Sequence, residues 1–244
     1  MFTDADRERV RRRLLELAEA DARIAAAAET GSLARGSQDA WSDIDLTFAL
    51  ADDADIEAVL HEWTERVEAE LAAVHHWDIT FRGSIARVFL LADGLEVDLV
   101  FSPQTEFGPR GPAFRIVFGE GERREPAIVD ANQLAGLGWH HLLHARAAIE
   151  RGHPWKAEFY ISAARDHVLA LACLRHGESA EYARGVDRLP RSATEPFEGS
   201  LVRSLAPDEL RRALAVVAAE YLRELDDELA GRVAPVVRTL FERS

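Results

Sequence analysis

Two different periods of apolar residues follow one another along the chain. In the first half, short runs alternate apolar residues with polar or small ones, which is the pattern of half-buried β-strands. These runs cover residues 43–50, 77–82, 86–92 and 95–102. In the second half, apolar residues recur every three to four positions, which predicts amphipathic helices. The helical patterns there cover residues 130–151, 154–176, 206–226 and 227–242.

Two helical segments and a hairpin turn complete the pattern of the first half. Residues 4–20 and 54–74 have the helical period, and Thr3 followed by Asp6 is typical of a helix N-cap. Asp93-Gly94 stands between two apolar runs and predicts a tight hairpin. The first half therefore mixes strands that are close in sequence with helices long enough to cover a sheet.

Other segments have no clear period. Residues 23–31 are ambiguous, because their alanines favour a helix although the segment ends in a turn. Residues 102–115 concentrate Pro and Gly and are expected to form a loop, and residues 116–126 add one more short strand. Residues 176–199 resemble a loop within the helical half.

These patterns predict an α+β fold in two parts. A small mixed β-sheet domain with flanking helices is expected over residues 1–125, and an all-α helical bundle domain over residues 126–244. The boundary between them is placed near Pro126.

Charge is distributed unevenly between the two parts. The chain has 244 residues and a net charge of −14, and residues 1–125 carry 26 Asp and Glu against 14 Lys and Arg. An acidic surface argues against binding a nucleic-acid backbone, which relies on clustered basic residues. It favours a cationic small-molecule partner, although a surface that only maintains solubility has the same composition.

The cysteine count and the apolar runs bear on the compartment. Cys173 is the only cysteine, which excludes internal disulfides. The N-terminus lacks the apolar core of a signal peptide, and no stretch approaches the roughly 18 apolar residues of a membrane span. A cytoplasmic protein without a membrane partner is the simplest expectation.

Four carboxylates occupy two of the predicted strands. Asp43 and Asp45 flank Ile44, while Glu96 and Asp98 flank Val97, so each pair points to one face of its strand. Convergent carboxylates form an oxygen-rich site that hard cations such as Mg²⁺ prefer. Taken alone, such a pair is also explained by a solvent-facing strand.

A Gly-Ser turn precedes the first acid pair. Gly31 permits a close approach of the backbone, and the NH groups and hydroxyl of Gly31-Ser32 can bind a phosphate. The stretch "TGSLARGSQDAWSDIDL" as a whole resembles the signature of the DNA polymerase β-like nucleotidyltransferase superfamily. That signature is Gly-Gly or Gly-Ser, nine to thirteen residues, then Asp-apolar-Asp/Glu-apolar. The stretch in this chain departs from the signature only at Thr30, because an apolar residue commonly precedes the Gly-Gly or Gly-Ser pair.

The resemblance implies roles for the residues of this motif and of the later strand. Ser32 is expected to bind a nucleoside triphosphate, and Asp43 and Asp45 to hold two Mg²⁺ ions. Asp98 is expected to be the third metal-site carboxylate, nearest the attacking hydroxyl. Glu96 is the rival of Asp98 for this position, because some antibiotic-modifying members have a glutamate in a similar strand. One acid of the pair could bind the metal while the other acts as general base.

Further contacts are expected from the segment after the turn and from the helical half. Arg35 and Ser37 are candidates for phosphate contacts, with surface capping as the alternative. The resemblance to aminoglycoside and lincosamide nucleotidyltransferases suggests that Lys156 contacts the triphosphate and that Glu158 binds an acceptor amine or assists as a base. A solvated helix face is the alternative for both.

The resemblance predicts an Mg²⁺-dependent nucleotidyltransferase. Such an enzyme transfers a nucleoside monophosphate, AMP from ATP or the equivalent from another NTP, to an acceptor hydroxyl, and pyrophosphate leaves. The acceptor is expected to be a small cationic molecule such as an aminoglycoside-like antibiotic. The alternatives are a protein or tRNA acceptor, as in toxin–antitoxin members of the superfamily, and a nucleotide-binding module without catalysis.

Overall fold

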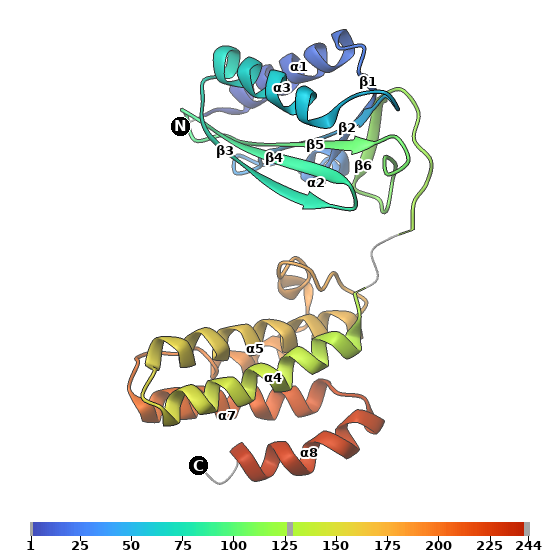
Figure 1. Cartoon of the computed structure of the whole chain (residues 1–244). Helices are drawn as coiled ribbons and strands as arrows, with labels where there is room; N and C mark the ends of the chain where they lie inside the picture. Colours follow the sequence, from blue (N-terminus) through green and yellow to red (C-terminus); the bar gives the residue numbers. More distant parts are fainter. Residues whose placement is uncertain (1, 126–128, 242–244) are drawn as a thin grey trace. The chain divides into compact units, whose positions relative to one another are not determined.

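The structure is a computed structural model that describes residues 2–125 and 129–241. The chain divides into two compact units, residues 1–127 and 128–244. The predicted boundary at Pro126 lies outside the described residues. The first unit contains the β-sheet and the second consists of helices (Figure 1), as the α+β prediction requires.

A six-stranded mixed sheet forms the centre of the first unit. The strands follow one another across the sheet in the order β3-β4-β5-β2-β1-β6. Their bounds are β1 Ile24–Thr30, β2 Ile44–Leu50, β3 Ala73–Phe81, β4 Ser84–Leu91, β5 Glu96–Pro103 and β6 Phe114–Phe118. β2 and β5 are parallel, and the other neighbouring strands are antiparallel. The parallel pair therefore joins two strands that lie about fifty residues apart in sequence.

Tight turns connect the strands at one edge of the sheet. Arg82 and Gly83, both with positive φ, join β3 to β4, as a two-residue hairpin requires. The predicted turn at Asp93-Gly94 joins β4 to β5, and Gly94 has a φ of 90°. These short connections align β3, β4 and β5 before the chain reaches the loop that precedes β6.

Two helices cover one face of the sheet. Helix α1, Asp4–Ala20, begins with the predicted capping box of Thr3 and Asp6, and helix α3 spans Ile56–Leu71. Both lie on the same side of the sheet (Figure 1), where they bury every second residue of the central strands. This core contains Val10, Leu14, Leu17, Val59, Leu60, Trp63 and Val67 from the helices with Ile44, Leu46, Phe48, Leu50, Val97, Leu99 and Phe101 from β2 and β5.

The alanine-rich segment that the sequence left ambiguous is strand β1. Ala27 packs in the core beneath the helices, while Ala26 and Ala28 pack with Phe107 on the opposite face. β1 lies between β2 and β6 and is buried on both faces, and small side chains fit that position. The tertiary environment therefore overrides the helix propensity of alanine.

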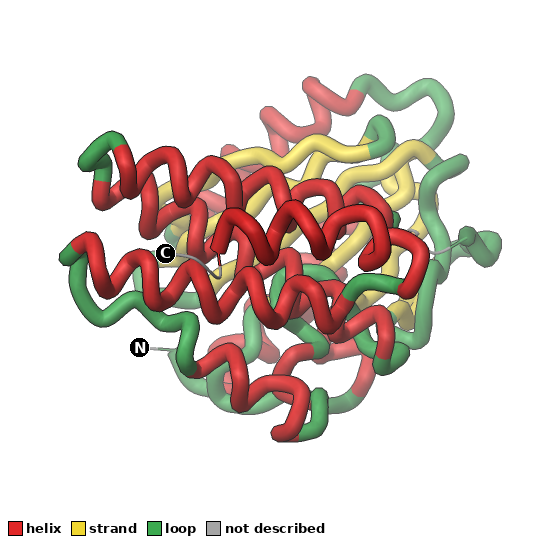
Figure 2. Tube along the Cα trace, turned by 90° about the horizontal axis from the view of Figure 1, so that it is seen from below, coloured by secondary structure: helices red, strands yellow, loops and turns green. Residues whose placement is uncertain are grey.

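The second unit is built from long helices that pack side by side (Figure 2). They are α4 Ala131–Glu150, α5 Pro154–Arg175, α7 Pro207–Glu224 and α8 Asp227–Phe241. Tyr221 is fully buried among them and donates a hydrogen bond to the carbonyl of Ala135 at 2.9 Å. None of the helices that the structure describes is both long and apolar enough to cross a bilayer.

One prediction for the helical half is wrong. Residues 176–199, expected to be a loop, contain a 3₁₀-helix, Val186–Arg188, and helix α6, Arg191–Glu198. Pro190 precedes α6, and Phe197 is buried in the core of the second unit. The sequence predicts a loop here because it contains Pro196 and Gly199, and both residue types favour turns.

A buried carboxylate links α1, β1 and α3 in the first unit. Asp21 is 8% exposed and accepts a hydrogen bond from Nε1 of Trp63 at 3.1 Å. It also accepts bonds from Nε and Nη2 of Arg23 at 2.9 and 2.8 Å. The guanidinium of Arg23 is the main cause that lowers the pKa of Asp21 to about 2.

We predict that Asp21→Ala destabilises the first unit at neutral pH. The change leaves the indole N–H of Trp63 without its acceptor and the guanidinium of Arg23 without its closest carboxylate, a loss of about 2–3 kcal/mol in the free energy of unfolding. Because the folded-state pKa is depressed, the stabilisation is present above the ordinary value of 3.8 and is lost as the pH falls through about 2.

Urea unfolding followed by circular dichroism between pH 7 and pH 2 measures this contribution. The difference between wild type and Asp21→Ala should narrow in the acid range. Asp21→Asn keeps an acceptor for the indole N–H of Trp63 and should therefore lose less unfolding free energy than Asp21→Ala. A difference that stays constant over the whole pH range would contradict the assignment.

Candidate active site

Two neighbouring parallel strands bring acids together. Asp45 of β2 and Asp98 of β5 are direct partners in the strand register. Ile44 and Leu46 are buried beneath the helices, so Asp45 between them points to the other face of the sheet. The same alternation in β5 directs Asp98 to that face. The pairing therefore places one acid from each predicted pair side by side.

The remaining two acids lie close to this pair in the chain. Glu96 is the first residue of β5, and Asp43 stands one residue before β2. Both are near enough to Asp98 to raise its pKa by charge repulsion. The structure thus gathers Asp43, Asp45, Glu96 and Asp98 at one end of the parallel strand pair.

Asp98 lies in surroundings that disfavour its charged form. Burial and the nearby carboxylate of Asp45 raise the pKa of Asp98 to about 7, and Glu96 and Asp43 add smaller repulsions. Within residues 2–125 and 129–241, Oδ1 of Asp98 is buried and has no hydrogen-bond partner. A buried carboxylate oxygen without a donor, beside other acids, is an environment that a cation would stabilise.

The turn after β1 lies directly against Asp45. Gly31 begins the short helix α2, Gly31–Arg35, with a φ of 59°, and a Cβ atom there would overlap Oδ2 of Asp45. Only glycine allows this approach of the backbone to the carboxylate. Oγ of Ser32 is also buried without a hydrogen-bond partner in the described part of the chain. Two unsatisfied polar groups, on Ser32 and Asp98, therefore occur in the predicted site.

Ion pairs hold the strand that leads into this turn. Glu29, 1% exposed, precedes Thr30 and pairs with Arg11 of α1 at 2.5 Å and with Arg115 of β6. These contacts fix the end of β1 from two neighbouring elements. These ion pairs therefore hold the end of β1, and with it the backbone of Gly31 beside Asp45.

The structure gives different surroundings to Arg35 and Ser37. Arg35 is exposed at the end of α2. The backbone N–H of Ser37 donates to the carbonyl of Ser32 at 3.1 Å, and its hydroxyl donates to the same oxygen at 3.4 Å. Ser37 thus closes the turn. A contact of either residue with phosphate stays a prediction.

Lys156 and Glu158 belong to α5 of the second unit. Nζ of Lys156 lies 6.0 Å from the centre of the Tyr160 ring. Glu158 accepts a hydrogen bond from the hydroxyl of Ser162 at 2.7 Å, one turn along the same helix. These contacts are local to the helix, and the roles of both residues toward a nucleotide or an acceptor stay predictions.

Asp43, Asp45, Glu96 and Asp98 are the candidate donors for a metal ion at this site. Among the described residues, no group of three or more His, Cys, Asp or Glu side chains is already arranged as a metal site. The carboxylates would therefore have to rotate toward a common ion. Their chemistry fits a hard divalent cation, because all donors are oxygens and Oδ1 of Asp98 lacks a partner.

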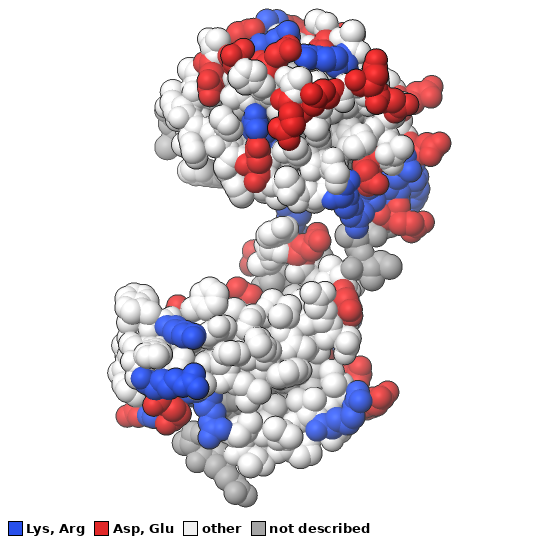
Figure 3. Space-filling model, in the orientation of Figure 1, with Lys and Arg blue, Asp and Glu red and all other residues white. Residues whose placement is uncertain are grey.

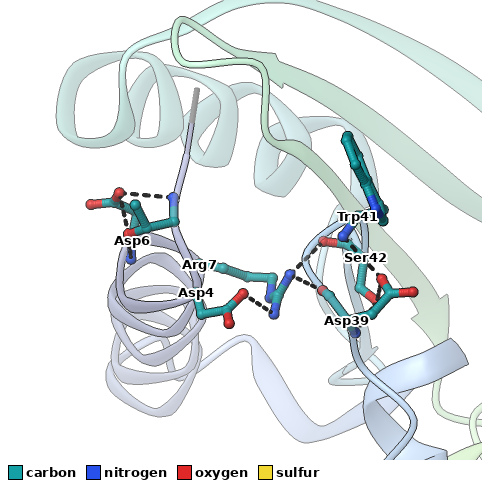
Figure 4. Close-up of polar contacts among 7 residues, drawn as sticks. Asp4, Asp6, Arg7, Asp39, Trp41 and Ser42 are labelled. Atoms are coloured by element: carbon teal, nitrogen blue, oxygen red, sulfur yellow. Dashed lines mark hydrogen bonds and ion pairs between the residues drawn. The ribbon is translucent and has the colours of Figure 1, made fainter.

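Sequence reasoning missed one charged residue beside this site. Arg7 of α1 is only 6% exposed and donates to the carbonyls of Asp39 and Ser42, just before Asp43 (Figure 4). The sequence does contain a signal for a buried Arg7, because Arg7 continues the apolar stripe of Val10 and Leu14 at helical spacing. A charged residue on a buried stripe requires polar partners.

Comparison with known proteins supports the resemblance. Residues 7–97 match the family model of the nucleotidyltransferase domain. The matched segment runs from Arg7 into β5 and includes the Gly-Ser turn, Asp43, Asp45 and Glu96. It is therefore identified as a nucleotidyltransferase domain, as the motif predicts.

Further comparisons add less. The crystal structure of an aminoglycoside 6-adenyltransferase from Bacillus subtilis is similar to the chain with 11% identity and a TM-score of 0.42, covering 97% of this chain and 98% of that one. These values are too low for the likeness to indicate a substrate. No curated protein sequence matches the chain.

We predict unequal effects of alanine at two glycines of this turn. Gly31 and Gly36 both have positive φ, 59° and 66°, but a Cβ atom at Gly36 meets nothing within 4 Å. Gly36→Ala should cost about 1 kcal/mol of unfolding free energy from backbone strain, and Gly31→Ala about 2–4 kcal/mol because it also displaces Asp45.

Chemical denaturation of the two variants tests this difference. Gly36→Ala is the matched control, since it carries the same backbone strain without the overlap. Equal losses in the two variants would contradict the close approach of Gly31 to Asp45.

Proposed function

We propose that the chain is a divalent-cation-dependent nucleotidyltransferase that transfers AMP from ATP to a hydroxyl group of a small cationic acceptor. The observation that carries the proposal is the register pairing of Asp45 with Asp98 beside Gly31. It occurs in a segment that matches the nucleotidyltransferase domain. Nucleotidyl transfer follows from the class of domain, whereas the metal, the nucleotide and the acceptor are our proposal.

Within the first unit, we assign some residues to phosphate binding and others to metal binding. The backbone at Gly31 and the hydroxyl of Ser32 bind phosphate oxygens of the nucleotide. Asp43, Asp45 and Asp98 would hold two Mg²⁺ ions, which when bound supply positive charge to the triphosphate and to the acceptor oxygen. The support for Ser32 and Asp98 is that each has a buried polar atom without a partner in the described residues.

One carboxylate accepts the proton of the acceptor hydroxyl. The acceptor oxygen forms a bond to the α-phosphorus, the bond from that phosphorus to the bridging oxygen breaks, and pyrophosphate carries the electron pair away. Oδ1 of Asp98 is the candidate for receiving the proton. The carboxylate of Glu96 at the start of β5 is the alternative.

Charge supports a cationic acceptor. The segment 1–125 carries 26 acidic residues against 14 basic ones, and acidic side chains are spread over the visible face of the first unit (Figure 3). Such a field attracts polyamines and aminoglycosides and repels nucleic acid. We assign Glu158 to an acceptor amine and Lys156 to the triphosphate as further parts of this proposal.

A transfer assay tests the proposal. Wild-type protein with Mg²⁺, α-³²P-labelled ATP and a panel of aminoglycosides and lincosamides should yield a labelled antibiotic. Asp43→Asn with Asp45→Asn should reduce transfer by more than about 100-fold, because the bound metal supplies several kcal/mol of transition-state stabilisation. Asp52→Asn with Asp53→Asn is the matched control, since it removes two charges at exposed positions after β2.

Several outcomes would contradict parts of the proposal. Transfer that is unchanged in the Asp43 and Asp45 double variant would overturn the site. Labelling of an added protein or tRNA instead of the antibiotics would contradict the proposed small-molecule acceptor but not the proposed transferase activity. Binding of ATP without transfer to any acceptor would indicate a nucleotide-binding module.

A further inference from the structure

We propose that Arg7 is a positioning residue that holds the segment 36–43, which we call the acid-leading loop, and thereby sets the position of Asp43. The loop joins α2 to β2 and ends at the first acid of the site. The inference rests on the proposed function for the part that concerns metal binding. The claim that Arg7 holds the loop in place concerns the fold alone and does not depend on the proposed function.

Arg7 is a buried cation that donates three hydrogen bonds. It lies on the same stripe of α1 as Val10 and Leu14 and is 6% exposed. Its Nη2 donates to Oδ1 of Asp4 at 2.9 Å. Its Nη1 donates to the carbonyls of Asp39 at 2.6 Å and of Ser42 at 3.1 Å. Burying a charge is costly unless such bonds compensate it, so these contacts determine where the side chain can lie.

The acid-leading loop depends on polar contacts for its shape. Residues 35–41 are all exposed, and Trp41 in this stretch is 83% exposed, so apolar burial does not hold it. A closed turn forms instead between Asp39 and Ser42. Oδ1 of Asp39 accepts from the N–H of Trp41 at 2.9 Å and from the hydroxyl of Ser42 at 3.1 Å, and Oγ of Ser42 accepts from the N–H of Asp39 at 3.0 Å.

Arg7 binds this turn at both of its ends (Figure 4). The carbonyl of Ser42 belongs to the peptide group that links Ser42 to Asp43, so the bond from Arg7 lies one peptide away from the acid. The guanidinium is anchored in turn by the helix that packs on the central strands. The contact therefore connects the position of Asp43 to the core.

The chemistry of the contact requires arginine. Two nitrogens of the planar guanidinium donate at once to the two carbonyls and to the carboxylate of Asp4. Lysine carries its donors on one nitrogen and cannot span the same acceptors. Arg7→Lys should therefore keep the charge and lose part of the hold.

Amide hydrogen exchange tests the hold without using activity. In Arg7→Met, exchange of peptides that cover the acid-leading loop should rise at least about 10-fold, as the loss of charge-assisted hydrogen bonds implies, while α3 keeps its protection. Arg7→Lys should fall between this variant and wild type. Arg9→Met is the matched control on the same helix, since Arg9 is exposed and pairs with the carboxylate of Asp6 at 2.6 Å.

Metal binding tests the consequence for Asp43. Titration with Mn²⁺, followed by electron paramagnetic resonance without nucleotide, should show affinity about 10-fold or more weaker in Arg7→Met, as is usual when a residue that orients a ligand is removed. In the transfer assay, the Mg²⁺ concentration for half-maximal rate should rise more than the KM for ATP. Arg9→Met should match wild type in both measurements.

The outcomes separate the two statements. Unchanged exchange of the loop in Arg7→Met would overturn the hold, and if that variant does not fold, wild-type exchange in Arg7→Lys would overturn it. Faster exchange with undiminished Mn²⁺ affinity would overturn the link to Asp43. If wild-type protein bound no Mn²⁺, the proposed function would fail, and with it the role of Asp43, while the exchange result would still decide whether Arg7 holds the loop.

Discussion

The burial of every second residue of β2 and β5 beneath α1 and α3 is the constraint on which the site depends. Side chains of adjacent residues in a strand point to opposite faces, so burying Leu46 and Leu99 beneath the helices directs Asp45 and Asp98 to the other face. A register slip of one residue would turn the acids into the apolar core. Hydrophobic burial therefore selects the register, and the register brings the two carboxylates together.

This arrangement opposes stability locally. Asp98 is partly buried beside like charges, and its pKa is raised to about 7. Gly31 holds a left-handed conformation to let the backbone approach Asp45. Unpaired polar atoms and left-handed backbone cost free energy and are characteristic of functional sites. The large core around Trp63, together with the ion pair between Asp21 and Arg23, compensates for these costs elsewhere in the unit.

Arg7 connects that core with the exposed end of the site. The turn at Asp39 and Ser42 has an internal hydrogen-bonded shape, and the guanidinium attaches this shape to α1. The apolar face of one helix thus carries both the residues that bury the sheet and the cation that holds the loop before Asp43. Packing and the geometry of the site are determined by the same element.

The sequence by itself determined the local elements and the motif. The period of apolar residues located α1, α3 and the long helices, and the order of Gly31-Ser32, Asp43 and Asp45 identified the class of domain. These features depend on neighbours within a few residues, which propensity and spacing describe. Only the tertiary structure decided that β5 pairs with β2, that the alanines of β1 form a strand and that Arg7 reaches the loop before Asp43. Such contacts join residues far apart in sequence, and they form only when the burial of a common core brings those residues together.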